Sequence, residues 1–188
     1  MIPARGAEAL DSIPAVMRRA LAIAVAGGCL AGASPAAART YRITVDHGFP
    51  VRLGPLKVQQ HPFVRDAESA FGRASSTRPV RGACKVRWSR LKLNATFTSF
   101  GAITDFCRDA RFQTAVLRSS VWQTWKGLRV GMASSRVLEL HRNAKFDRGK
   151  WVLATQSVFG PEPAPTVSAL VRRGRVYALS LFVGAAGD

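Results

Sequence analysis

Segments in which every second residue is apolar constrain this chain most, because a period of two is typical of a β-strand with one buried face. The cysteine, valine and tryptophan of residues 84–88 share one face, and the leucines, alanine and phenylalanine of residues 91–97 share another. The parity changes at Ser89-Arg90, where a tight turn would reverse the chain. The two segments therefore predict an antiparallel hairpin.

The C-terminal part repeats this pattern. Residues 167–171 and 175–183 alternate in the same way and flank Arg172-Arg173-Gly174, where the glycine can adopt the positive φ that a hairpin turn requires. Residues 151–159 form another strand candidate, which ends at the proline-rich stretch 161–165. We therefore expect a second hairpin and at least one further strand.

Two short segments have helical periodicity instead. Apolar residues at positions 63, 64, 67, 70 and 71 fall on one face of a helix that would begin near Pro62 and end at Gly72. A second helix would begin with Ser134 as its N-cap and bury Val137, Leu138 and His141.

The N-terminal 38 residues have the layout of a cleavable secretory signal. Arg18 and Arg19 precede an apolar stretch at 20–32, and Ala36 and Ala38 supply the small side chains of a cleavage site. The stretch is too short to span a bilayer. The prediction is an exported domain, residues 39–188, without a transmembrane span.

Two features of this leader leave alternatives open. Glu8 and Asp11 are unusual ahead of an apolar stretch, so Met17 is a second candidate for the true start. Cys29 follows Ala-Gly-Gly, a weak likeness to the site at which bacterial lipoproteins are cleaved and lipidated. The protein is therefore expected to be secreted or associated with the cell envelope, with a lipid anchor on Cys29 as the less favoured alternative.

The exported part is strongly basic. Removing residues 1–38 takes away three of the 28 basic and two of the 11 acidic residues, which leaves 25 and 9 and a net charge of about +16. A field of this size attracts anionic polymers and surfaces without selecting one. The candidate surface for an anionic ligand comprises Lys85, Arg87, Arg90, Lys92, Arg172, Arg173 and Arg175. The alternative is a solvated basic face in a protein from an arginine-rich proteome.

The cysteine content agrees with export. The exported part holds two cysteines, Cys84 and Cys107, and an even pair in an oxidising compartment is most simply a disulfide. Two free thiols are the alternative.

Residues that could support catalysis do not form a recognisable constellation. His47, His61 and His141 are far apart in the sequence, and none has a metal-ligand spacing. Gly127 and Gly131 lack the Lys and Ser or Thr of a phosphate-binding loop. We expect a protein that is not an enzyme and that has no cofactor or metal. Specific recognition of nucleic acid is not expected either.

Two stretches of the exported part match one another. Leu56-Lys57-Val58 and Leu128-Arg129-Val130 are 72 residues apart and precede the two predicted helices, and a strand with a tryptophan, Trp88 or Trp151, follows each helix. This predicts tandem units over about 49–118 and 119–188, with chance similarity of short apolar patterns as the alternative.

The stretch 127–137 carries a further motif, in which glycines flank an apolar-basic-apolar step before Met132 and the helix. Its structural residues are Gly127, Gly131, Met132 and Ser134. The motif resembles that of the β-lactamase inhibitory protein-like fold, shared in outline with the outer-membrane barrel-assembly lipoprotein. His141-Arg142 stands where that family usually has an aromatic residue and a proline.

The resemblance implies an α+β, β-rich fold of two tandem units, each a short helix packed on antiparallel strands. It also implies a scaffold that binds through a sheet face, and none of the family's functional residues can be assigned here. We therefore expect a non-enzymatic binding module acting on a protein or an anionic envelope polymer. An envelope-assembly factor and an inhibitor of a secreted enzyme are the alternatives.

Overall fold

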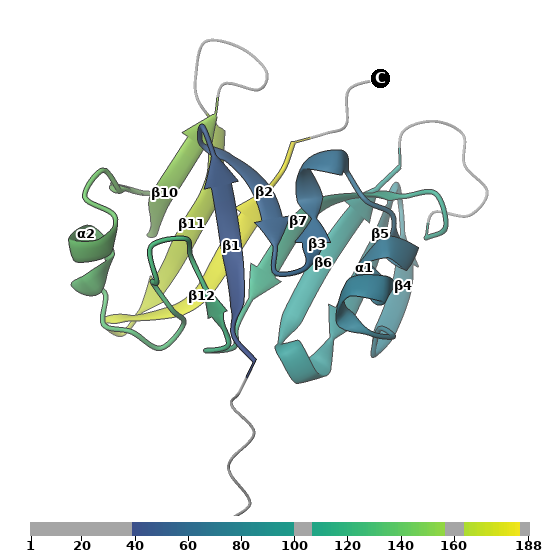
Figure 1. Ribbon diagram of the computed structural model, residues 1–188, viewed down its shortest axis with the longest axis horizontal. Coiled ribbons are helices and arrows are strands. Elements are labelled where there is room, and N and C mark those ends of the chain that lie inside the picture. Colours follow the sequence, from purple (N-terminus) through teal and green to yellow (C-terminus); the bar gives the residue numbers. More distant parts are fainter. Residues whose placement is uncertain (1–38, 100–106, 157–163, 185–188) are drawn as a thin grey trace, which may run out of the picture. The chain divides into compact units, whose positions relative to one another are not determined.

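An eight-stranded antiparallel sheet forms most of the structure (Figure 1). The computed structural model describes residues 39–99, 107–156 and 164–184, all within one compact unit. The predicted leader, with Met17, Cys29, Ala36 and Ala38, lies outside the described residues. In spatial order the strands are β4 (Ser76–Val80), β5 (Ala83–Trp88), β6 (Leu93–Thr98), β7 (Arg111–Leu117), β12 (Arg175–Phe182), β11 (Ala164–Arg172), β10 (Lys150–Gln156) and β9 (Lys145–Asp147).

Both predicted hairpins are present. β5 pairs with β6 and β11 pairs with β12, each antiparallel. Arg173 and Gly174 adopt positive φ in the second turn, as expected from the glycine. The first turn is longer than predicted: the 3-10 helix η2 (Ser89–Leu91) and Lys92, which has φ of +46°, separate the strands. The strand predicted at 151–159 is β10, and residues 157–159 lie outside the described part.

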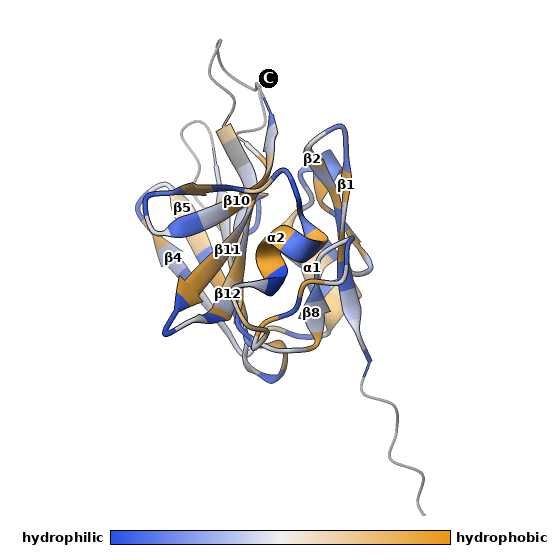
Figure 2. Cartoon of the chain, turned by 90° about the vertical axis from the view of Figure 1, so that its left-hand side faces the viewer, coloured by the Kyte–Doolittle hydropathy of each residue, from blue (hydrophilic) through white to orange (hydrophobic). Residues whose placement is uncertain are grey.

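A second layer covers one face of this sheet. It contains a smaller sheet in the order β3 (Leu56–Lys57), β2 (Phe49–Leu53), β1 (Tyr41–Asp46) and β8 (Trp122–Gln123), in which only β1 and β8 are parallel. The 3-10 helix η1 (Val58–Gln60) follows β3. The smaller sheet and both α-helices lie on the same side of the large sheet (Figures 1 and 2).

The first helix, α1 (Val64–Phe71), matches its prediction. The Asp66 carboxylate accepts a hydrogen bond from the Phe63 N–H at 2.9 Å, which satisfies a donor at the helix start. Gly72 ends the helix with φ of +83°. Val64 and Ala67 are buried, as the periodicity requires.

The second helix, α2 (Arg136–Leu140), corrects two expectations. Ser135 rather than Ser134 occupies the N-cap position, and no side chain caps the helix. The backbone oxygen of Ser134 instead accepts a hydrogen bond from the Val137 N–H at 3.0 Å. Leu138 is 46% exposed, so its predicted burial is wrong, because in a helix this short Val137 and, in part, Leu140 are the side chains that face the core.

Aromatic side chains fill the core between the layers. Trp122 is fully buried, and its ring lies 4.9 Å from that of Tyr41 and 5.9 Å from that of Phe71. The indole N–H of Trp122 donates to the Leu91 carbonyl at 2.8 Å, and that of Trp88 donates to the Gly72 carbonyl at 2.7 Å. Both buried indole donors are therefore satisfied, which removes the cost of burying them.

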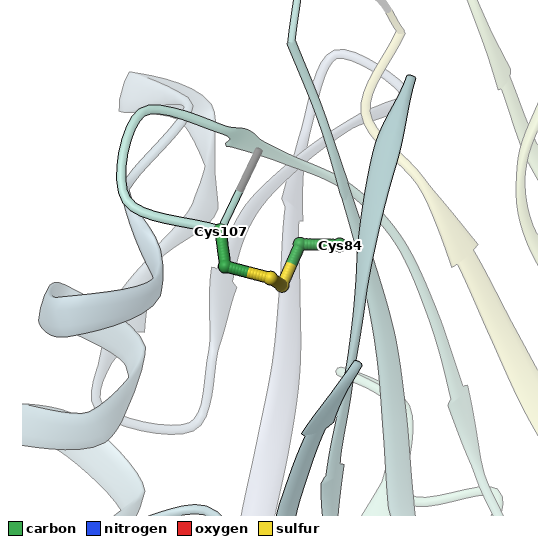
Figure 3. Close-up of a disulfide and its surroundings, with 2 residues drawn as sticks. All are labelled: Cys84 and Cys107. Carbon is green, nitrogen blue, oxygen red and sulfur yellow. A yellow bond between two sulfur atoms is a disulfide. The ribbon is translucent and has the colours of Figure 1, made fainter. Parts of the chain in front are cut away.

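The predicted disulfide is confirmed. Cys84, on β5, is bonded to Cys107 in the segment that leads to β7, with a Cα–Cα distance of 4.9 Å (Figure 3). The bond closes a loop across a sequence separation of 23 residues. The chain-entropy relation gives a stabilisation of about 3 kcal/mol for a loop of that length.

Gly48 lies where the smaller sheet approaches strand β10 of the large one. It follows His47 in the β1–β2 turn. The φ angle is +44° for His47 and +82° for Gly48. A Cβ on Gly48 would lie 2.2 Å from the backbone oxygen of Thr155 on β10. The backbone of a sheet strand cannot move aside as a flexible side chain can.

We expect Gly48→Ala to lower the free energy of unfolding by about 3 kcal/mol, through positive φ and overlap with the Thr155 carbonyl. Gly149 is the matched control: it has φ of +81° in the β9–β10 turn, with nothing within 4 Å of an added Cβ. Gly149→Ala should cost only about 1 kcal/mol. Urea unfolding measures both values, and equal losses would contradict this packing.

Candidate binding surface

One face of the large sheet is left open by the second layer, and the strand registers identify its residues. On β5, Cys84, Val86 and Trp88 are buried toward the helices, whereas the intervening Lys85 and Arg87 are exposed on the opposite face. Arg78 of β4 pairs with Lys85. The register carries this face on to Asn94 and Thr96 of β6 and to Thr114 and Val116 of β7.

A hollow of about 380 Å³ lies on this face over strands β4 to β7. Its lining consists of Ser76, Arg78, Lys85, Val86, Arg87, Asn94, Ala95, Thr96, Thr114 and Val116. Three members are cations, four are neutral polar residues, and none is acidic or aromatic. The hollow therefore offers positive charge and hydrogen-bonding groups beside the apolar residues Val86, Ala95 and Val116.

The three cations of the hollow lie close together without a compensating charge. Arg78 and Lys85 stand directly opposite each other on neighbouring strands, and Arg87 follows Lys85 on the same face. Among the described residues no carboxylate forms a salt bridge with any of the three. Like charges directly opposite in a sheet are destabilising. A conflict of this kind is typical of a surface selected for binding an anion rather than for stability.

The rest of the open face has a different character. At its centre the register places Ser180 and Phe182 of β12 beside Val116 and Thr114 of β7. A second hollow, of about 340 Å³, lies at the β9–β10 end and is lined by Asn143, Lys145, Asp147, Val152, Leu153, Ala154 and Thr155. It contains Lys145 and the carboxylate of Asp147, so it lacks the net positive charge of the first hollow.

The predicted basic residues occupy three separate places. Of these residues, only Lys85 and Arg87 line the hollow over β4 to β7. Arg90 and Lys92 belong to the η2 turn. Arg172, Arg173 and Arg175 lie at the β11–β12 turn, where the Arg175 guanidinium donates to the Gly131 carbonyl at 2.9 Å. Arg78 is an addition to the predicted set, because Pro79 beside it is a residue that argues against a strand.

The loop that contains Gly131, Met132 and Ser134 forms backbone hydrogen bonds with the β11–β12 hairpin. Gly131 has φ of +97°, and its N–H donates to the Val176 carbonyl at 2.7 Å. The Val176 N–H donates to the Met132 carbonyl at 2.9 Å, and the Ser134 N–H to the Gly174 carbonyl at 2.8 Å. Met132 packs against the core, and Gly127 has φ of +85° in the preceding turn. Gly131, Met132 and Ser134 therefore fix the hairpin that carries Arg172 to Arg175.

His141 is buried beside this motif, with 3% of its surface exposed. Its Nε2 shares a hydrogen bond of 2.8 Å with the Thr124 hydroxyl, which also accepts from the Leu128 N–H at 3.2 Å. The Trp125 ring packs edge-on at 4.7 Å. Burial, and secondarily the charge of Lys126, lower the pKa of His141 from 6.5 to about 4. The imidazole is therefore neutral near pH 7 and acts as a core residue.

Ser69, His61 and Asp66 are the residue types of a Ser-His-Asp catalytic triad, but each contacts a backbone group instead. The Ser69 hydroxyl donates to the Arg65 carbonyl, the Asp66 carboxylate accepts from the Phe63 N–H, and His61 Nδ1 lies 3.4 Å from the Phe112 carbonyl oxygen. Within the described ranges no group of three or more His, Cys, Asp or Glu side chains could hold a metal ion.

Comparisons with protein-family models, curated proteins and solved structures give no match. The resemblance to the β-lactamase inhibitory protein-like fold therefore stays a prediction from the motif. In the part of the chain that the structure describes, no helix is long and apolar enough to cross a membrane.

Proposed function

We propose that this protein is an exported, non-enzymatic binding module whose open sheet face holds an acidic macromolecule over β4 to β7. The observation that carries the proposal is the uncompensated group of Arg78, Lys85 and Arg87 at the floor of one hollow. Export rests on the leader at 1–38, and the Cys84–Cys107 disulfide is compatible with an extracellular location. The site of action would be the medium or the cell envelope.

We also propose that the domain consists of two tandem units. Each would comprise one helix followed by four consecutive antiparallel strands, α1 with β4 to β7 and α2 with β9 to β12. Trp88 on β5 and Trp151 on β10 then fall on the second strand of each unit. The last strands, β7 and β12, pair at the centre of the sheet, which supports one continuous face built from both units.

The test is salt-dependent binding to immobilised heparin, a polyanion that requires no knowledge of the natural ligand. We expect the triple variant Arg78→Gln/Lys85→Gln/Arg87→Gln to bind about 30-fold more weakly than wild type at low salt. The slope of log K against log salt should also fall by about 2.

The matched control removes the same charge from the other side of the molecule. Arg52, Lys57 and Arg142 are exposed, on β2, on β3 and after α2. The variant Arg52→Gln/Lys57→Gln/Arg142→Gln should retain most of the affinity. Equal losses in the two triple variants would show that only net charge matters, and the proposed surface would be rejected.

A second candidate function, inhibition of a secreted enzyme or another protein contact, would use the centre of the same face. Phe182 and Val116 are partly exposed there and could anchor a protein partner. Binding that is unaffected by salt and lost in Phe182→Ala would favour this function over the first.

A further inference from the structure

The spacing of the three cations suits a chain with regularly repeated anionic groups. Lys85 and Arg87 are two residues apart on one strand, so their side chains leave the sheet about 7 Å apart. Arg78 is directly opposite Lys85 on β4, with about 5 Å between the Cβ atoms of such a pair. One anion can thus lie between Arg78 and Lys85, and a second can lie at Arg87.

The remainder of the hollow favours hydroxyl groups between those anions. Asn94 is opposite Arg87, Thr96 is opposite Lys85, and Thr114 is opposite Thr96 on the next strand. These side chains donate and accept hydrogen bonds and carry no charge. They can therefore bind a hydroxylated linker that runs past the two anions.

The same lining disfavours other polyanions. Single-stranded nucleic acid is held by stacking its bases on aromatic rings, and no aromatic residue lines this hollow. A protein interface has an apolar core with aromatic anchors, whereas seven of the ten residues that line this hollow are charged or polar and none is aromatic. A homopolymer of glutamate or aspartate also has no hydroxyl groups between its carboxylates.

We infer that the hollow over β4 to β7 binds a phosphodiester-linked polyol chain, with two successive phosphates on the Arg78–Lys85 pair and on Arg87, and the intervening hydroxyls on Asn94 and Thr96. A phosphate–three-carbon–phosphate repeat is of similar length to the cation spacing, and Arg binds phosphate through two parallel hydrogen bonds. This inference rests on the proposed function, because it names the ligand class for the same surface.

The experiment is calorimetric titration of the wild-type protein with four probes of matched charge. The probes are an oligomer of glycerol phosphate, polyglutamate, oligo-thymidine and a heparin oligosaccharide. We expect the glycerol phosphate oligomer to bind at least tenfold more tightly than the other three.

The double variant Asn94→Ala/Thr96→Val, which keeps all three cations, should lose about tenfold in affinity for the glycerol phosphate oligomer alone. Thr77→Val, an exposed position outside the hollow, is the control and should change nothing.

The possible outcomes distinguish failure of this inference from failure of the proposed anion-binding function. If all four probes bind equally and the Arg78/Lys85/Arg87 variant still weakens them, the polyol inference fails and the anion-binding function stands. Tighter binding of polyglutamate would indicate an acidic protein partner and would overturn the inference as well. If no probe depends on the three cations, both proposals fail.

Discussion

Trp122→Ala will lower the free energy of unfolding by about 4 kcal/mol, the largest loss we expect from a single substitution. Trp122 is fully buried on the edge strand β8, where it contacts Tyr41 and Phe71 and donates to the Leu91 carbonyl. Truncation removes the ring contacts and leaves a cavity between the two sheets. It also leaves the part-buried Leu91 carbonyl without this donor, and the lost hydrogen bond adds to the cost.

Trp122→Phe separates packing from hydrogen bonding. Phenylalanine retains most of the buried ring and lacks the indole donor, so its cost should be about 2 kcal/mol. Urea unfolding with an unchanged denaturant slope measures both variants. A loss below about 1.5 kcal/mol for Trp122→Ala would contradict the central packing position assigned to this side chain.

The second large effect is a loss of stability on acidification that depends on His141. Its pKa is about 4 in the folded protein and 6.5 for the free side chain. The unfolded state therefore binds the proton first as the pH falls. His141 contributes its full stabilisation above pH 6.5, and this contribution declines progressively down to about pH 4. A difference of that size corresponds to about 3 kcal/mol in total.

The measurement is the free energy of unfolding between pH 7 and about pH 5.5, above the range in which most carboxylates titrate. His141→Gln should reduce the slope in this window, because the titrating group is gone. His47 provides the matched control, since its side chain is 97% exposed and His47→Gln should leave the slope unchanged. A wild-type protein with constant stability across the window would contradict the buried, neutral imidazole.

The elements that the sequence predicted are those in which one local pattern agrees with the tertiary environment. The strands β5 and β6 alternate clearly because one face is buried and the other is exposed, whereas β11 and β12 alternate in sequence although Thr166 to Ala169 are all buried. The helix α1 has both its apolar stripe and its terminal glycine. The disulfide could be predicted because the exported part holds two cysteines and an oxidising compartment favours their pairing. That prediction did not depend on the strand that carries Cys84.

The elements that were missed have weak or conflicting patterns. β4 reads Ser-Thr-Arg-Pro-Val, and a proline is acceptable there only because β4 is an edge strand. Register shifts occur within the β6–β7 and β1–β2 pairs, which interrupt the alternation that would have revealed β7 and β1. The β1–β2 turn is formed by His47 and Gly48, and a histidine with positive φ gives no turn signal in the sequence.

Only part of the candidate site could be predicted, because alternation within one strand does not show which strands pair. Lys85 and Arg87 were assigned to an outward face from alternation alone. Arg78 could not be added, because it lies on β4 and its position opposite Lys85 is a property of strand pairing. Arg90 and Lys92 belong to the same predicted surface, yet they lie in the η2 turn and not on a strand of the sheet. Strand registry, which depends on long-range pairing, decides which charges share a surface.

The most direct test of the central claim is to map amide chemical-shift changes while a polyanion, heparin or a glycerol phosphate oligomer, is titrated into the intact protein. The account predicts that the changes concentrate on β4 to β7, around Arg78, Lys85, Arg87, Thr96 and Thr114. Shifts that spread evenly over all exposed cations, or that centre on β1 to β3 on the opposite side, would contradict the claim that the open face of the large sheet is the working surface.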